Sequence, residues 1–307
     1  MPSHKQSKVR GRRNRRNKFV FRRHTACPRN AWCGNIYVWL DRCAFLGIAS
    51  KAKAHALHAI KIVVAADEHR QFRVRRQGSE QWKYYQAAVI PPDLLHEFDG
   101  MGNRLGLFYV IAESAEGQHI LEAYDKEKVC AISPDTIEGV LPHMRDALRV
   151  DQPSKDKAGD LWDVMVGTLA PWISVSPSFE EHVQKALDYM WGLLQSKFGP
   201  QHRLTIEEVA QVVHWSYSHF RHRFSEELEV TFTTYLISLL FLAAMWRDPV
   251  ANRLSDIAAD VGFYDGPHLY RTFKELLGLS KPELFRHCEL VLCFRPFLDN
   301  RTGLNPV

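Results

Sequence analysis

The chain has 307 residues, of which 46% are hydrophobic and 24% are charged, and this composition excludes a disordered, a collagen-like or a coiled-coil protein. The length predicts one large domain or two of medium size. No run of about 20 apolar residues could form a membrane span, and the six cysteines lack the spacing of a disulfide framework. The sequence therefore predicts a soluble protein without a membrane partner, located in a reducing cytoplasm.

The net charge of +5 is unevenly distributed along the chain. Residues 1–30 contain eleven Lys or Arg and no acid, so the remaining 277 residues carry a net charge of −6. This predicts a basic, disordered arm over residues 1–30. Such an arm is usually a solvated tail, and in some proteins it binds nucleic acid; both interpretations stay open.

Residues 31–150 are expected to form a β-rich domain. Short apolar runs separated by polar residues, Gly or Pro predict a β-sandwich or barrel; they lie at Ile36–Leu40, Ala44–Ile48, Ile60–Val64, Phe72–Arg75, Ala87–Ile90 and Leu105–Val110. A helix capped by Ser133 is expected over residues 133–150. The polar segment 151–160 predicts a linker, followed by a short helix over 161–170.

The last third of the chain is expected to be helical and contains an internal repeat. Ser178 can cap a helix that ends near Ser196. Farther along, apolar residues recur at an offset of 48 or 49: Val209, Ala210, Val213, Trp215, Phe220 and Phe224 match Ile257, Ala258, Val261, Phe263, Leu269 and Phe273. Each copy predicts a helix-turn-helix, and two matching copies favour this over a plain helical hairpin without a DNA role.

The turns of the two copies differ. Thr205 is the expected cap of the first copy, and Ser255 that of the second. In the second copy Gly262 supplies the left-handed backbone that ends the first helix. The first copy has His214 at that position, and keeping the left-handed conformation there costs about 1 kcal/mol.

The second copy resembles the AraC/XylS family of bacterial transcription regulators. The resemblance is carried by Leu254–Phe263, His268–Lys274, Gly278–Ser280 and Phe285–Arg286, and it extends over about residues 179–290. It implies an α+β two-domain fold: a cupin-like β-sandwich or barrel over residues 31–150, a linker with a short helix over 151–178, and an all-α DNA-binding domain over 179–290. In that domain a linker helix joins the two helix-turn-helix motifs, and a tail follows at 291–307. Val89–Asp93 and His96 are similar to the sensor half of such regulators.

The resemblance also implies a function. It predicts a sequence-specific DNA-binding regulator rather than an enzyme, one that binds double-stranded DNA as a homodimer and contacts RNA polymerase. The family implies an activator, and the residues themselves leave activation and repression both open. A small-molecule effector would bind the N-terminal domain. A metal-dependent cupin enzyme with an accessory helical domain, and a protein–protein module that has lost contact with DNA, are the alternatives.

The resemblance places the DNA-contacting residues on the outward faces of two helices. In the first motif they are Tyr217, Ser218, Arg221, His222 and Ser225; in the second they are Gly266, Pro267, Tyr270, Arg271 and Lys274. Arg221 and Arg271 are predicted to read guanine, because a guanidinium fork matches its O6 and N7 acceptors. Tyr270 and Lys274 are expected to hold phosphates. A solvated surface arginine is the alternative at either position.

Two features depart from the family. The linker helix at Tyr235–Trp246 has eleven apolar residues in twelve and no charge, so it must be buried on most sides; we expect it to pack against the sensor domain or a second subunit. Residues 201–290 carry a net charge of −3, whereas nucleic-acid binders usually have a basic face. Either protonated histidines or the basic arm would then supply positive charge.

His55, His58 and His96 form the one metal-like set of the N-terminal domain. Cupin enzymes hold metals with such residues, but side chains three apart face opposite sides of a strand. We therefore predict no metal and no cofactor. The three histidines are instead expected to line an effector pocket, together with Trp39 and Tyr84.

Overall fold

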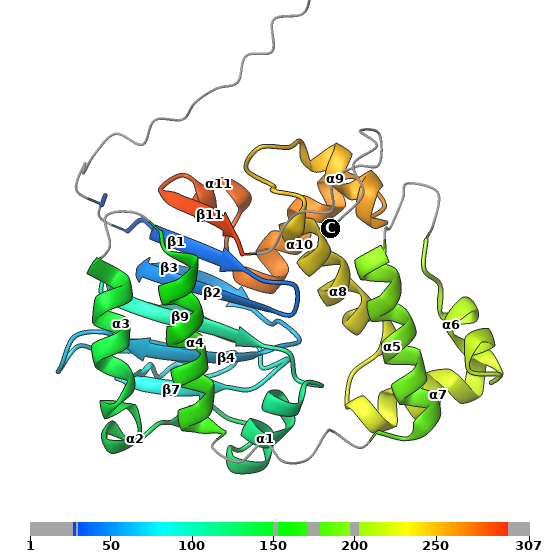
Figure 1. Ribbon diagram of the computed structural model, residues 1–307, viewed down its shortest axis with the longest axis horizontal. Coiled ribbons are helices and arrows are strands. Elements are labelled where there is room, and N and C mark those ends of the chain that lie inside the picture. Colours follow the sequence, from blue (N-terminus) through cyan, green and yellow to red (C-terminus); the bar gives the residue numbers. More distant parts are fainter. Residues whose placement is uncertain (1–26, 29, 150–152, 171–178, 197–202, 294–307) are drawn as a thin grey trace, which may run out of the picture.

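The computed structural model describes residues 27–28, 30–149, 153–170, 179–196 and 203–293. Ser178, the predicted cap of a helix, lies outside these residues, as do most of the predicted basic arm and most of the predicted tail. The order of a β-rich domain followed by a helical one is confirmed (Figure 1).

The β-rich domain is built from two sheets. The larger has the strand order β10-β7-β4-β9-β2-β1-β11 and comprises β1 (Cys33–Val38), β2 (Arg42–Ile48), β4 (Ile60–Ala65), β7 (Ala87–Ile90), β9 (Arg104–Val110), β10 (Cys130–Ala131) and β11 (Cys288–Leu292). The smaller has the order β3-β8-β5-β6 and comprises β3 (Lys51–His55), β5 (Phe72–Arg76), β6 (Lys83–Tyr85) and β8 (His96–Asp99). Every predicted β-rich run falls on one of these strands.

Both faces of the larger sheet are covered. On one face Val63 and Leu107 share a hydrophobic core with Phe98 of the smaller sheet. On the other face Phe108 packs with Trp162, and Figure 1 shows the helices lying across that face. These helices are α2 (Pro134–Glu138), α3 (Val140–Arg149) and α4 (Lys155–Leu169), and α1 (Ala115–Ala123) precedes them. Strand β4 is buried at all six positions because it lies inside this sandwich.

Two predicted boundaries are corrected. The helix predicted over residues 133–150 is divided at Gly139, which ends α2. The linker predicted at 151–160 is shorter than expected, because the Ser154 side chain accepts a hydrogen bond from Lys157 N and caps α4. The helix expected at 161–170 therefore begins at Lys155.

The helical domain follows the predicted plan. Its helices are α5 (Glu181–Ser196), α6 (Ile206–Val212), α7 (Tyr217–Leu228), α8 (Phe232–Trp246), α9 (Leu254–Val261), α10 (Gly266–Leu277) and α11 (Lys281–Phe285). Thr205 caps α6 as predicted. Ser255 does not cap α9: the helix begins at Leu254, after an extended Arg253 that provides no side-chain cap.

The helical domain is docked on the β-rich domain by backbone hydrogen bonds. Strand β11 pairs in parallel with β1, so the last strand of the described chain lies beside the first (Figure 1). Residues 291 and 292, expected in a tail, thus belong to the sheet. In addition, Lys53 N of β3 donates to Gly278 O at 3.0 Å and Ala56 N donates to Glu275 O at 3.2 Å, which anchors the end of α10.

Gly278 is required at this contact. Its φ is +68°, and a Cβ at this position would lie 2.3 Å from Lys53 O. Only glycine adopts this backbone conformation without strain and leaves room for the strand.

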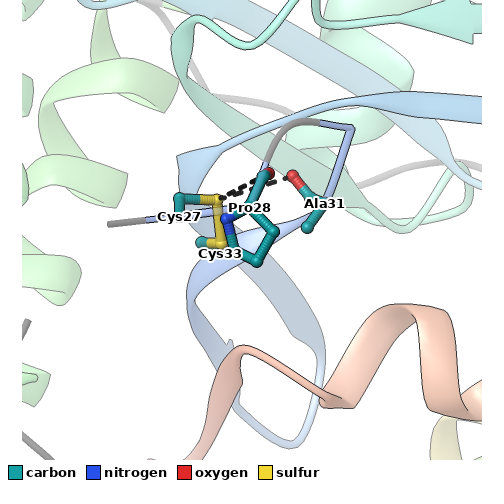
Figure 2. The surroundings of a disulfide bond; sticks show 4 residues. All are labelled: Cys27, Pro28, Ala31 and Cys33. Atoms are coloured by element: carbon teal, nitrogen blue, oxygen red, sulfur yellow. Dashed lines mark hydrogen bonds between the residues drawn. A yellow bond between two sulfur atoms is a disulfide. The ribbon is translucent and has the colours of Figure 1, made fainter. Parts of the chain in front are cut away.

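A disulfide joins Cys27 and Cys33 just before β1 (Figure 2). A turn closed by Ala31 N and Pro28 O at 3.1 Å brings the two cysteines together. The sequence predicts no disulfide framework, and it gives no indication of this single bonded pair. Spacing alone could not show that a turn falls between them. Cys43, Cys130, Cys288 and Cys293 are free thiols.

No single helix among the described residues has both the length and the apolarity of a membrane span. The pair α7 and α8, which is bent by 70°, reaches that length and composition when the two are taken together.

Candidate nucleic-acid interface and interdomain cavity

The first helix-turn-helix consists of α6 and α7. Val209, Val213, Phe220 and Phe224 are fully buried between the two helices and their neighbours. His214 has a φ of +57°, so the left-handed turn predicted at this position is kept without glycine. The turn is closed by Trp215 N, which donates to Ala210 O at 2.9 Å.

The second helix-turn-helix consists of α9 and α10 and has the same internal arrangement. Ile257, Val261, Leu269 and Phe273 are at most 1% exposed. Gly262 ends α9 with a φ of +91°. Of the apolar residues that match between the two copies, the structure buries all except Trp215, which is partly exposed.

Helix α8 connects the two motifs by packing against both cores. At its start the ring of Phe232 lies 5.8 Å from that of Phe220 and 5.6 Å from that of Phe224. Toward its other end Phe241 packs edge-on against Phe273, with ring centroids 4.9 Å apart. Because α8 is shared by both cores, it fixes the two motifs relative to each other.

Most of the predicted DNA-contacting residues lie on the surface. Tyr217, Ser218, Arg221, His222, Pro267, Arg271 and Lys274 are exposed, and Ser225 and Tyr270 are partly exposed. Gly266 is buried instead, because α9 passes close to it: a Cβ there would lie 3.0 Å from Ser255 N. Gly266 therefore shapes the motif and offers no side chain to a ligand.

The two arginines predicted to read bases have no carboxylate partner within the described part of the chain. Arg223, by contrast, is held by Glu180 at 3.0 Å and by Glu226 at 2.7 Å. Lys274 Nζ lies 4.9 Å from the ring centroid of Tyr270. Arg221 and Arg271 thus keep their guanidinium groups available at the surface.

The β-rich domain adds positive charge next to α10. Hydrogen bonds from Ser280 lower the pKa of Glu283, and the charges of Lys53 and Lys274 lower it further. Lys53 of β3 is exposed. Lys53 of the β-rich domain therefore adds positive charge beside the second motif of the acidic helical domain.

A cavity of about 130 Å³ lies between the sheets and α8. The β-rich domain contributes His55, His58, Lys61 and Tyr109 to its wall, and α8 contributes apolar residues such as Leu239 and Met245. The apolar linker helix is thus buried against the β-rich domain, which is the first of the two packings that the sequence predicted. Trp246 Nε1 also donates to Trp39 O at 3.0 Å.

The structure separates the residues predicted for this pocket. His55 and His58 line the cavity, and His96 lies behind Lys61. Trp39 packs against Tyr37 and Trp162 outside the lining, and Tyr84 is 51% exposed on β6. The aromatic part of the prediction is therefore wrong, because neither side chain belongs to the wall of the cavity that His55 and His58 line.

Lys61 is a buried candidate for a functional residue that no sequence motif indicates. It is the second residue of β4 and is 4% exposed. Its Nζ is 2.7 Å from His55 Nε2 and 3.0 Å from His96 Nε2. Burial lowers the pKa of Lys61 to about 7. The available signal was a lysine inside the otherwise apolar run of residues 60–65.

His58 is held between two carboxylates. Its Nδ1 lies 2.5 Å from Asp93 Oδ2 and its Nε2 lies 2.6 Å from Glu113 Oε1. Burial acts to lower the pKa of His58, but the hydrogen bonds with Asp93 and Glu113 outweigh it and raise that pKa to about 10. The imidazolium ring packs edge-on against Tyr235 of α8, with centroids 5.7 Å apart.

The three histidines do not converge on a common point. His55 and His96 face Lys61, whereas His58 faces Asp93 and Glu113. Across the described ranges no group of three or more His, Cys, Asp or Glu side chains is arranged to hold a metal ion. The shared site that the metal-dependent alternative needs is therefore not formed by these residues.

Two hydroxyl groups of α8 lack hydrogen-bond partners among the described residues. Ser238 Oγ and Tyr235 Oη are buried, and both residues line the cavity. The Trp191 side chain lies near the Tyr235 hydroxyl but outside hydrogen-bond geometry. Because buried polar groups normally have partners, these hydroxyls indicate a place for a polar atom of a ligand or of water.

Comparisons with known proteins agree with this architecture. A family model described as a helix-turn-helix domain matches residues 209–287. The apo form of ToxT from Vibrio cholerae is 8% identical, with a TM-score of 0.50, and the match covers 79% of this chain and 96% of that one. At this identity the likeness concerns the fold alone.

Two further solved structures are similar at lower scores. ToxT from Vibrio cholerae O395 is 7% identical, with a TM-score of 0.47, over 82% of this chain and 94% of that one. The AraC-like transcriptional activator CuxR is 9% identical, with a TM-score of 0.33, over 64% of this chain and 73% of that one. No curated protein matches the sequence.

Proposed function

We propose that this chain, whose C-terminal region is an AraC-type helix-turn-helix domain, regulates transcription by reading a specific DNA sequence under the control of a small effector. The observation that carries the proposal is the pair of buried-core motifs with Arg221 and Arg271 exposed and without a carboxylate partner among the described residues. The guanidinium of each would read guanine, and Tyr270 and Lys274 would hold phosphates.

A selection of binding sites from random duplex DNA tests the DNA-binding role. The full chain should enrich two short motifs whose centres lie about 10 base pairs apart, because two recognition helices on one face of DNA enter successive major grooves. The double variant Arg221→Ala, Arg271→Ala should enrich neither motif. If the unaltered chain enriches no sequence, the proposal fails and the protein–protein module becomes the better interpretation.

The effector role is assigned to the interdomain cavity, with the two-sheet domain acting as a cupin-like sensor. An apolar wall, the buried amine of Lys61 and the unpaired hydroxyls of Ser238 and Tyr235 suit an apolar molecule with one polar group. Such a molecule would touch the sheet and α8 together. Its binding would therefore shift the equilibrium of conformations toward one arrangement of the sensor domain and the linker helix.

A thermal-shift screen of apolar small molecules tests the cavity. A ligand that binds only the folded protein raises its stability by RT ln(1 + [L]/Kd). The stabilising compounds should lose their effect on Ser238→Phe, which fills the cavity, and keep it on Ser218→Phe at the surface of α7. Equal stabilisation of both variants would place the binding site elsewhere.

The partners that accompany this function are double-stranded DNA, RNA polymerase and a second copy of the chain, in the cytoplasm. Because α8 is covered by the sensor domain, it does not offer an exposed apolar face for dimerisation. We expect the dimer interface elsewhere. Sedimentation of Lys51→Glu and of Leu95→Glu, two exposed positions of the β-rich domain, would begin to locate it.

A further inference from the structure

The surroundings of Lys61 define the hydrogen-bonding state of its amine. His55 Nδ1 donates to Lys53 O at 2.7 Å, and His96 Nδ1 donates to Leu94 O at 2.6 Å. A carbonyl oxygen can only accept, so both rings carry their proton on Nδ1 and both Nε2 atoms are acceptors. Lys61 Nζ must therefore be the donor in its two contacts with these rings.

These two contacts suit a neutral amine. A neutral amine has two N–H bonds and one lone pair, whereas an ammonium has three N–H bonds. His55 and His96 take two hydrogens, and no described carboxylate or carbonyl oxygen is hydrogen-bonded to Nζ. The remaining direction meets the aromatic wall, where Nζ lies 5.6 Å from the ring centroid of Phe98 and 5.8 Å from that of Tyr109.

The amine is also accessible to a ligand, because Lys61 lines the interdomain cavity. The residues that face it from neighbouring strands are His55 of β3, His96 and Phe98 of β8, and Tyr109 of β9. None of them is an anion at neutral pH, since burial lowers the pKa of His55 and of His96 and raises that of Tyr109. A buried, uncompensated lysine beside an apolar space is the environment in which an amine acts as a nucleophile.

We propose that Lys61 captures the carbonyl group of an apolar aldehyde as a reversible imine, so that the effector is bound covalently. This rests on the proposed effector role of the cavity and adds the chemical class of the ligand. The imine would lie between β4 and α8, where the apolar chain of the aldehyde meets Leu239 and Met245.

The step balances without an oxidant or a reductant. The lone pair of Lys61 Nζ attacks the carbonyl carbon, and the C–N bond forms as the carbonyl π bond opens onto oxygen. The two N–H protons then leave with that oxygen as one water molecule, and a C=N double bond remains. The Nε2 atoms of His55 and His96 already accept hydrogen bonds from these two N–H groups, so they are placed to take the protons in transit.

Lys61 is less protonated at pH 7 than an exposed lysine, and this favours its reaction with an aldehyde. With a pKa of about 7, roughly half of its amine is neutral at pH 7, whereas an exposed lysine has a neutral fraction of about one in a few thousand. Lys51, which is exposed on β3, is the internal reference. We expect Lys61 to be modified at least about tenfold faster than Lys51 when the aldehyde is limiting. This factor is set well below the ratio of the neutral amine fractions of a lysine with a pKa of about 7 and an exposed lysine.

The experiment traps the imine on the full chain. The protein is incubated at pH 7 with limiting decanal and sodium cyanoborohydride, which reduces an imine to a stable secondary amine, and modified lysines are located by peptide mapping. The expected result is a reduced decyl adduct on Lys61. Lys61→Met should lose this adduct, and the matched variant Lys51→Met should keep it.

A parallel thermal shift separates this inference from the proposed function, with decanal and decanoic acid added without reductant. If Lys61 is labelled no faster than Lys51 while either compound stabilises the chain but not Ser238→Phe, the covalent inference is overturned and the cavity remains an effector site. If decanal does not label Lys61 and neither compound stabilises the chain, decanal capture is overturned and the apolar-effector role loses its support. The map of the unaltered protein decides the question even if Lys61→Met fails to fold.

Discussion

His58 and Lys61 are two buried bases whose pKa values move in opposite directions. The pKa of His58 is about 10 and that of Lys61 about 7 in the folded chain. Above pH 6.5, His58 is more protonated in the folded chain than in the unfolded chain, so its contribution to the unfolding free energy falls as the pH rises. Lys61 holds less proton folded than unfolded above pH 7, so its contribution rises.

We therefore expect a nearly flat pH profile of unfolding free energy between pH 7 and about pH 8.5, above which buried thiols contribute as well. Lys61→Met should remove the rising contribution, so its stability should fall across this interval. Lys51→Met, a matched change at an exposed lysine, should stay flat. Urea unfolding at several pH values measures this, and a flat profile for Lys61→Met would contradict the two pKa shifts.

The specificity of DNA recognition is expected to depend on individual arginines. Arg221→Ala and Arg271→Ala should each lose about 1–3 kcal/mol of discrimination at one position of the operator. Arg223→Ala is the control on the same helix as Arg221, because its guanidinium is engaged by Glu180 and Glu226. Competition binding with single-base variants of the selected site would show this. A uniform loss over all sequences would instead make Arg221 or Arg271 a phosphate contact.

At the scale of elements, the repeat of two helix pairs depends on aromatic anchors. Phe273 of α10 is fully buried and touches Phe241 of α8. Phe273→Ala should lower the unfolding free energy by about 3–5 kcal/mol. Tyr264, which is 75% exposed in the turn of the same motif, is the control, and Tyr264→Ala should change stability by less than about 0.5 kcal/mol. Denaturant unfolding of both variants measures the difference.

The contact between β3 and α10 depends on one backbone conformation. Gly278→Ala would place a methyl group against Lys53 O at a positive φ, and we expect a loss of at least about 1–2 kcal/mol. Gly192→Ala in α5 is a suitable control, because a Cβ there meets nothing within 4 Å. It should be neutral or slightly stabilising in the same unfolding measurement.

The elements predicted from sequence are those whose signal is local. The helix-turn-helix cores follow from apolar spacing, and Gly262 marks its turn by itself. The pairing of β11 with β1 joins residues about 250 positions apart, and nothing within either segment signals it. Lys61 was missed for a related reason: His55 and His96 reach it from strands of the other sheet, so the cluster exists only after the sheets are stacked.

At the scale of the whole molecule, β11 holds the helical domain to the β-rich domain. A chain that ends after His287 lacks this strand, and we expect its sheet and helical domain to unfold in two separate transitions at lower denaturant. A chain that ends after Cys293 keeps β11 and is the matched control, with the transition of the full chain. Unfolding followed by circular dichroism and by tryptophan fluorescence would distinguish them. Identical curves for both truncations would mean that the remaining contacts are sufficient.

The pairing of β1 with β11 also has a consequence for synthesis on the ribosome. Strand β1 keeps an open edge until β11, which lies about 250 residues later in the chain, has been translated. The nascent β-rich domain therefore exposes unpaired backbone groups while the helical domain is still being produced. Translation that stops before β11 should yield aggregation-prone fragments with an open sheet edge rather than a separately folded β-rich domain.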